Sequence, residues 1–135
     1  MGTRSKTNVI DCNGNIIISI YRQMDGDIEH HGKSLKRFLK RNKLAQRINK
    51  ETKCPEYQNG MEDLAGELLC YLKTQTKSVM PAYPATNNDC AFEYEIGFYE
   101  AGTVQATIND TPSKLYIKCR YYDYEKFKDS DWGFI

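Results

Sequence analysis

An Asn-Gly pair, Asn13-Gly14, separates two runs of β-forming residues near the N-terminus. The runs span residues 9–12 and 16–21 and are rich in isoleucine. A two-residue turn between antiparallel strands needs positive φ at both central positions, which Asn and Gly tolerate best. The sequence therefore predicts a β-hairpin over residues 9–23, and the rest of the fold has to be built around it.

Two amphipathic helices are expected after the hairpin. The first begins near Gly32, with apolar residues three and four positions apart. These residues are Leu35, Phe38 and Leu39. The second begins near Asn59, which has the spacing of a capping box with Glu62, and runs to about residue 76. Its apolar stripe consists of Met61, Leu64, Ala65, Leu68, Leu69 and Leu72.

The last third of the chain alternates apolar and polar residues with the period of two that is typical of strands. The alternation covers residues 90–98, 104–108 and 115–122, after a loop that contains Pro81 and Pro84. The order β-β-α-α-β-β-β predicts an α+β fold, in which the N-terminal hairpin and the C-terminal strands form an antiparallel sheet with both helices on one face. We expect a single domain over residues 1–135, with 123–135 as a charged and aromatic tail.

Composition argues against several classes of protein. Nineteen Lys and Arg against 18 Asp and Glu give a net charge of +1, so no overall field favours nucleic acid or a membrane surface. Five cysteines without a CxxC pair argue against a disulfide framework and a structural zinc site. A polar N-terminus and the absence of a long apolar run lead us to expect a cytoplasmic protein without membrane segments.

The loop before the first helix carries residue types that bind metals. They are Asp25, Asp27, Glu29, His30 and His31. A calcium loop needs glycine at its sixth position and glutamate at its twelfth, and here these positions are His30 and Lys36. Adjacent histidines generally point in different directions, so we expect a solvated turn and no metal.

Gly32-Lys33-Ser34 looks like the end of a phosphate-binding loop, but Asp27 occupies the position of the first glycine of that motif. A helix N-terminus still favours an anion, which makes His31, Gly32 and Lys33 a predicted secondary anion site. No nucleophile motif is present, so no catalytic residue is predicted. If the chain were an enzyme, Asp25 and His31 could serve as an acid–base pair.

Aromatic and basic residues alternate on one face of the last predicted strand. They are Tyr116, Lys118, Arg120 and Tyr122. Rings stack on bases and cations pair with phosphates, so this face could bind a nucleotide, or it could be a tyrosine-rich contact between subunits. Residues 33–50 contain eight basic residues and no acidic one, which favours a solvated helix face over a nucleic-acid site.

The N-terminal region resembles a family of small phage, prophage and bacterial proteins. The resemblance rests on MGTRSxTxV at residues 1–9, YRQxDG at 21–26 and HGKxLxxFL at 31–39. This family is similar to the phage Thoeris anti-defence sponges, which bind cyclic ADP-ribose isomers made by TIR-domain enzymes without cleaving them. The resemblance implies sequestration of a nucleotide-derived immune signal in the host cytoplasm. It also implies a homo-oligomer, with the ligand at a subunit junction and no cofactor.

Such a ligand, a cyclic ADP-ribose isomer or a cyclic oligonucleotide, needs rings against its base and cations against its phosphates. The residues expected to supply them are Arg4, Arg22, Phe92, Tyr94, Tyr116, Lys118, Arg120 and Tyr122. Three other functions stay open from the residues. They are an enzyme acting on a phosphorylated nucleotide, a nucleic-acid-binding module using the basic helix 33–50, and a protein inhibitor of a host enzyme.

Overall fold

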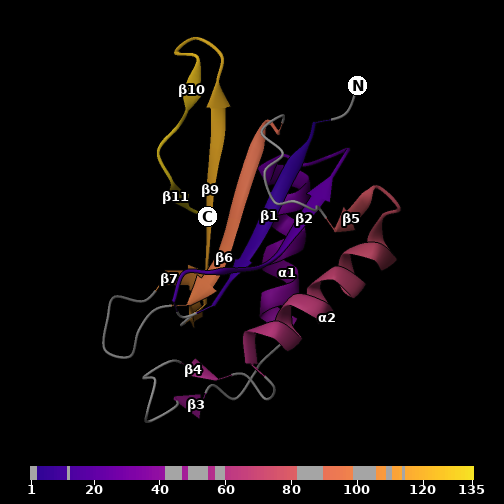
Figure 1. Ribbon diagram of the computed structural model, residues 1–135, viewed down its shortest axis with the longest axis vertical. Helices are drawn as coiled ribbons and strands as arrows, with labels where there is room; N and C mark the ends of the chain where they lie inside the picture. Colours follow the sequence, from indigo (N-terminus) through magenta and orange to yellow (C-terminus); the bar gives the residue numbers. More distant parts are fainter. Residues whose placement is uncertain are drawn as a thin grey trace.

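A computed structural model describes residues 3–11, 13–41, 47–48, 55–56, 60–81, 90–98, 106–108, 111–113 and 115–135. In these ranges the chain forms a seven-stranded sheet with two α-helices against one of its faces (Figure 1). The sheet contains the N-terminal hairpin and the C-terminal strands. The predicted α+β fold is therefore confirmed.

The helical elements are a single π turn, η1 (Ile28–Gly32), and the helices α1 (Lys33–Arg41) and α2 (Gly60–Gln75). The strands of the main sheet are β1 (Ser5–Ile10), β2 (Ile16–Arg22), β5 (Val79–Pro81), β6 (Phe92–Phe98), β9 (Leu115–Asp123), β10 (Lys128–Asp129) and β11 (Gly133–Phe134). Two short pairs lie outside it. They are β3 (Arg47–Ile48) with β4 (Pro55–Glu56), and β7 (Ala106–Ile108) with β8 (Thr111–Ser113).

Strand β1 lies in the interior of the sheet, between β2 and β6 (Figure 1). The strand order is β10-β9-β6-β1-β2-β5, and β11 also pairs with β9. All neighbours are antiparallel except β1 and β6, which run parallel with Lys6 opposite Glu93. The predicted antiparallel sheet is thus confirmed except at this junction. A parallel pair needs a long crossover, and the chain between β2 and β6 supplies it with both helices.

The predicted hairpin forms between β1 and β2. Gly14 has a φ of 81°, and its N–H donates to the Asp11 carbonyl at 3.1 Å. The Asp11 carboxylate accepts the N–H groups of Asn13 and Asn15, each at 2.9 Å. The turn residues therefore satisfy one another locally. The hairpin is confirmed, but its connection, from Ile10 to Ile16, is longer than the expected two-residue turn, and Gly14 has a positive φ whereas Asn13 does not.

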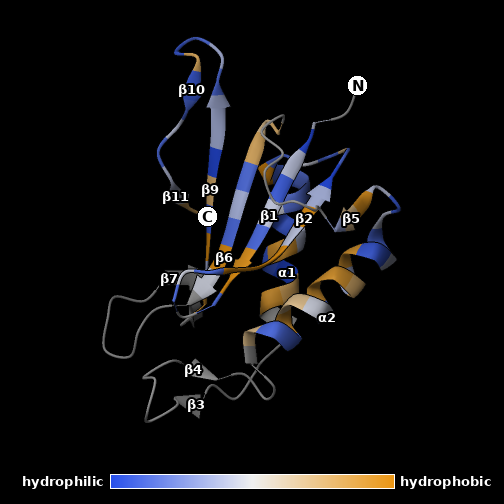
Figure 2. Cartoon of the chain, viewed as in Figure 1, coloured by the Kyte–Doolittle hydropathy of each residue, from blue (hydrophilic) through white to orange (hydrophobic). Residues whose placement is uncertain are grey.

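The core lies between the sheet and the helices; hydrophobic and polar residues alternate along β6, whereas β1 is polar over most of its length (Figure 2). The sheet contributes Val9, Ile20, Tyr94, Ile96, Leu115, Ile117 and Cys119, among others. Both predicted helical stripes face this core, and of their members only Leu69 is partly exposed. Helix α2 ends at Gln75, close to the expected end, while its expected cap at Asn59 lies outside the described residues.

Three predictions about the second half need correction. The segment expected as the second C-terminal strand contains β7, which pairs with β8 and does not join the main sheet. Pro81, expected in a loop, ends the edge strand β5. The expected tail folds back along β9 as β10 and β11, and the Ile135 N–H donates to the Ile117 carbonyl at 3.1 Å.

Gly26 has no room for a side chain. A Cβ there would lie 2.6 Å from Ser5 Cβ and 2.9 Å from the Ser5 backbone nitrogen, and β1 cannot shift inside the sheet. We expect Gly26→Ala to lower the free energy of unfolding by about 1–3 kcal/mol in urea denaturation. Gly66→Ala is the control, because Gly66 is exposed on α2 with nothing within 4 Å of its Cβ position. It should add about 0.5–1 kcal/mol, and equal stability of the two variants would contradict this packing.

Candidate functional site

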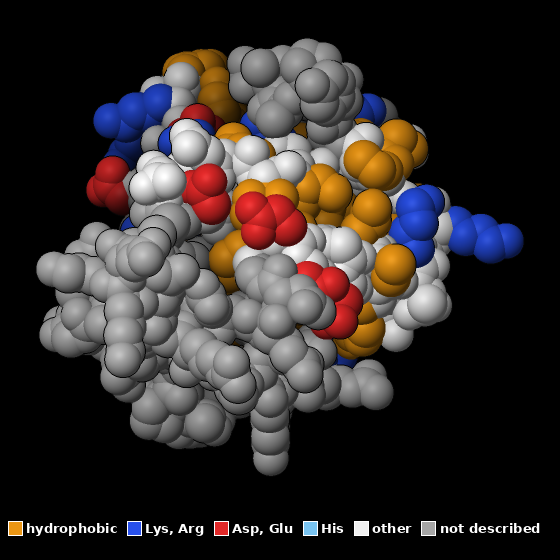
Figure 3. Space-filling view, turned by 60° about the horizontal axis from the view of Figure 1, so that its bottom comes forward, with side chains coloured by type: hydrophobic (Ala, Val, Ile, Leu, Met, Phe, Trp, Pro, Cys, Tyr) orange, Lys and Arg blue, Asp and Glu red, His pale blue; other side chains and the backbone are white. Residues whose placement is uncertain are grey.

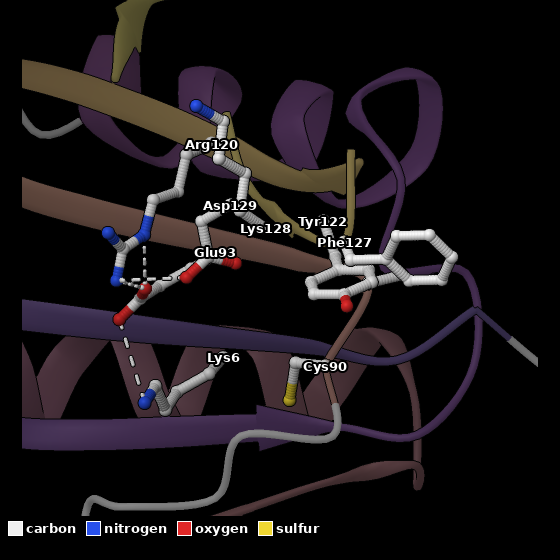
Figure 4. Close-up of a pocket in the computed structure, with 9 residues that line it drawn as sticks. Lys6, Cys90, Glu93, Arg120, Tyr122, Phe127, Lys128 and Asp129 are labelled. Carbon is white, nitrogen blue, oxygen red and sulfur yellow. Dashed lines mark hydrogen bonds and ion pairs between the residues drawn. The ribbon is translucent and has the colours of Figure 1, made fainter. Parts of the chain in front are cut away.

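Three charged side chains form a row across the sheet face that points away from the helices. Lys6 of β1, Glu93 of β6 and Arg120 of β9 are register partners in adjacent strands. Figure 4 shows them pointing toward one another. The period of two along each strand places all three on the same face, opposite the core.

Glu93 is the centre of this row. Its Oε1 accepts a hydrogen bond from Arg120 Nε at 2.7 Å, and its Oε2 accepts one from Asn8 Nδ2 at 3.0 Å. Lys6 Nζ lies 3.6 Å from the same Oε2. The carboxylate thus binds a cation on each side. Since it is only 17% exposed, these contacts are shielded from water more than surface ion pairs are.

A cleft of about 450 Å³ opens beside this row. Its lining residues are Lys6, Cys90, Ala91, Glu93, Arg120, Tyr122, Phe127, Lys128 and Asp129. Phe127 of the turn between β9 and β10 lines the cleft together with Lys128 and Asp129 of β10, and Figure 4 shows the rings of Tyr122 and Phe127 away from the charged row. The volume lies within the usual range for small-molecule sites.

Aromatic rings of β9 itself and of residues 132–134 pack against the cations of β9. The Arg120 guanidinium carbon lies 4.6 Å from the centre of the Trp132 ring. Lys118 Nζ lies 5.1 Å and 5.2 Å from the ring centres of Tyr116 and Phe134. Sequence reasoning missed Trp132 and Phe134, although their spacing of two residues was the available sign that they share a strand face.

The predicted ligand-binding residues do not form one site, because the sheet separates them. Tyr116, Lys118, Arg120 and Tyr122 lie on the face away from the helices. Arg4 directly precedes β1, two residues before Lys6, so the period of two assigns it to the same face, and its carbonyl accepts the Ala91 N–H at 3.0 Å. Arg22, Phe92 and Tyr94 lie on the helix side. Tyr94 is fully buried, donates to the Gly26 carbonyl at 2.7 Å and is closed to a ligand.

The helix side holds a buried polar cluster around His31. Arg22 Nη1 lies 3.2 Å from His31 Nδ1, and His31 Nε2 lies 2.6 Å from Thr7 Oγ1. A guanidinium can only donate, so Nδ1 accepts and the ring proton sits on Nε2, which donates to Thr7. The Tyr94 ring packs against the imidazole edge at 4.9 Å. Burial, aided by the Arg22 charge, lowers the pKa of His31 to about 3.

The predicted anion site at His31, Gly32 and Lys33 does not form in this structure. His31 is buried, and the N–H groups of His31 and Gly32 donate to the Asp27 carbonyl. Lys33 pairs with Glu29 at 2.9 Å. The N–H groups and the ammonium group that an anion would need are therefore already paired. The acid–base pair considered for an enzyme does not form either, because His31 is buried whereas Asp25 is exposed.

Basic side chains do not form a large patch on the described residues seen in Figure 3, where the lower end of the molecule in Figure 1 comes forward. Figure 3 shows acidic side chains among hydrophobic ones in the middle of this surface and basic side chains toward its edges. On α1, Arg37 donates to Ser34 Oγ at 3.2 Å. Within the described residues of 33–50, the charge of Lys33 is offset by its ion pair with Glu29.

Searches for related proteins give no match: no family model, no curated protein and no solved structure is similar to the chain. Among the described residues, no helix has the length and apolar character needed to cross a bilayer.

The two histidines are expected to titrate differently. His31 should stay neutral until the pH approaches 3, whereas the hydrogen bond that His30 Nδ1 donates to the Asp27 carboxylate raises the pKa of His30 above its ordinary value. Because the unfolded chain protonates His31 near 6.5, it binds more protons than the folded chain between these values. Stability should therefore fall as the pH drops from about 6.5 toward 3. NMR titration of the imidazole Cε1–H signals measures the pKa values of His30 and His31. Two histidines that titrate together near pH 6.5 would contradict the buried cluster.

Proposed function

We propose that this protein binds a small nucleotide-derived anion in the cleft beside Lys6, Glu93 and Arg120, and retains it without cleaving it. The observation that carries the proposal is the position of Arg120. Its guanidinium is held by Glu93 on one side and by the Trp132 ring on the other, at the edge of a cleft that also contains Tyr122 and Phe127. A preorganised guanidinium beside exposed rings suits a phosphate joined to a base.

Each part of the cleft has a chemical role in this proposal. Its cations are Lys6, Arg120 and Lys128, and its carboxylates are Glu93 and Asp129. The cations exceed the carboxylates by one, which favours an anion while Glu93 keeps Lys6 and Arg120 in place without a ligand. Phe127, which is 81% exposed, and Tyr122 offer ring faces to a base.

Retention without chemistry agrees with the groups in the cleft. No histidine lines it; its thiol and carboxylates are those of Cys90, Glu93 and Asp129, and Glu93 is already paired with Lys6 and Arg120. Sequestration needs only tight binding, with no preference for a transition state. The cleft offers cations and rings, which provide such binding.

The biological role that we propose is that of a phage anti-defence sponge for a cyclic ADP-ribose isomer or a cyclic oligonucleotide, acting in the cytoplasm of the host cell. What supports it is the resemblance of residues 1–39 to the family of small phage, prophage and bacterial proteins that is similar to such sponges. We also propose that the chain acts as a homo-oligomer. Five exposed aromatic residues between positions 121 and 134 support a subunit contact. They are Tyr121, Tyr124, Phe127, Trp132 and Phe134.

The direct test is retention of ligand. The full chain is incubated with a mixture of TIR-derived cyclic ADP-ribose isomers, filtered, and then heated to release what it holds. We expect mass spectrometry to find ligand missing from the filtrate and returned intact after heating. Ligand that returns altered would identify an enzyme, and ligand that stays in the filtrate would refute the proposal for this class.

Replacement of one cation tests the location of the site. Arg120→Ala removes a charge-assisted phosphate contact worth about 1.5–3 kcal/mol, so affinity should fall at least about tenfold. Arg37→Ala is the matched control, because Arg37 is exposed on α1 and does not line the cleft. Isothermal titration of both variants measures this, with a thermal melt to show that each is folded. Equal affinities would place the site elsewhere.

A further inference from the structure

The loop between β2 and η1 brings together three side chains that can bind a metal. Asp25, Asp27 and His30 each offer a ligand atom, and these atoms all lie within 4.8 Å of one another. His30 Nδ1 lies 2.9 Å and 3.0 Å from the two carboxylate oxygens of Asp27. Two ligands at right angles around an ion, each about 2.1 Å away, are separated by about 3 Å. The observed spacing is therefore one that an ion can bridge.

The backbone beneath these side chains is held at successive positions. Arg22 Nε donates to the Met24 carbonyl at 2.6 Å, and the Gly26 N–H donates to the Thr3 carbonyl at 2.9 Å. The Tyr94 hydroxyl donates to the Gly26 carbonyl, and the Asp27 carbonyl accepts three N–H groups of η1. The donor side chains thus project from a fixed backbone, so little ordering is lost when an ion binds.

An unpaired hydroxyl lies under the same loop. Ser5 Oγ is fully buried and has no hydrogen-bond partner. It points at Gly26, the residue between the two aspartates, and would lie 2.8 Å from a Cβ at that position. Buried polar atoms nearly always have partners, and a bound water or ion is one of the explanations of an unpaired one. This observation is independent of the three donor side chains.

We propose that Asp25, Asp27 and His30 bind a divalent transition-metal ion. Two carboxylates and one imidazole suit Mn²⁺, Co²⁺ or Zn²⁺, whereas Ca²⁺ takes oxygen ligands. The exposure of Asp25 and His30 leaves the outer coordination positions to water or to a ligand. His31 takes no part, since its ring is buried and bonded to Thr7 and Arg22. The site shares no residue with the proposed nucleotide cleft.

The test is a titration of the untagged full chain with Mn²⁺ alone. The electron paramagnetic resonance signal of free Mn²⁺ measures how much of the ion remains unbound. Mn²⁺ is chosen because it prefers oxygen and nitrogen ligands, so the cysteines do not compete for it. We expect saturable binding of one ion per chain. His30→Ala and Asp25→Asn should each weaken it by more than about tenfold. Glu29→Gln is the matched control, because Glu29 belongs to the same loop but pairs with Lys33.

The outcomes separate a built site from general attraction to acidic groups. Unchanged affinity in Glu29→Gln together with the two losses supports the proposal. No saturable binding by the unmodified chain, or equal weakening in Glu29→Gln and His30→Ala, would overturn it. Thermal melts of each variant without metal show whether a loss reflects misfolding, and Asp25→Asn, which keeps the side-chain shape, provides a second variant if His30→Ala is unstable.

Discussion

Burial of a polar strand inside the sheet is the constraint on which the rest of this structure depends. Strand β1 places Lys6, Thr7 and Asn8 in the interior, each less than a tenth exposed. A buried polar group without a partner costs about 1–3 kcal/mol, so each of them has to be satisfied. Thr7 is hydrogen-bonded to His31, and Asn8 is hydrogen-bonded to Ser19 and to Glu93. The Lys6 ammonium group pairs with the Glu93 carboxylate. These partners come from η1, β2 and β6, so satisfying β1 positions three other segments.

Glu93 connects this constraint to the candidate site. On one side it completes the bonding of β1, and on the other it orients Arg120, which the Trp132 ring holds from the C-terminal segment. The charges that stabilise the sheet are therefore the charges that an anion in the cleft would meet. The His31 cluster lies on the opposite face, where it supports the loop of Asp25 and Asp27, and neither histidine lines the cleft.

Local patterns predicted the local elements. Asn13-Gly14 specified the hairpin, and the apolar stripes specified both helices, because turn geometry and helical period are properties of neighbouring residues. The sequence could not predict the parallel pairing of β1 with β6, since alternation identifies the faces of a strand but not its partner. For the same reason the predicted ligand-binding residues were assigned to one site although they lie on two faces of the sheet. Tyr94 and Tyr116 look equivalent in the sequence, and only the sheet shows that they point to opposite faces.

The single tryptophan tests the central claim most directly, because Trp132 packs against the Arg120 guanidinium at the edge of the cleft. Fluorescence of the full chain is followed while cyclic ADP-ribose isomers are added. If phosphate binds at Arg120, the cation over the indole ring is disturbed, and a saturable change in Trp132 emission should follow the same curve as ligand retention. Retention of ligand without any change in Trp132 emission would contradict the assignment of the cleft as the binding site.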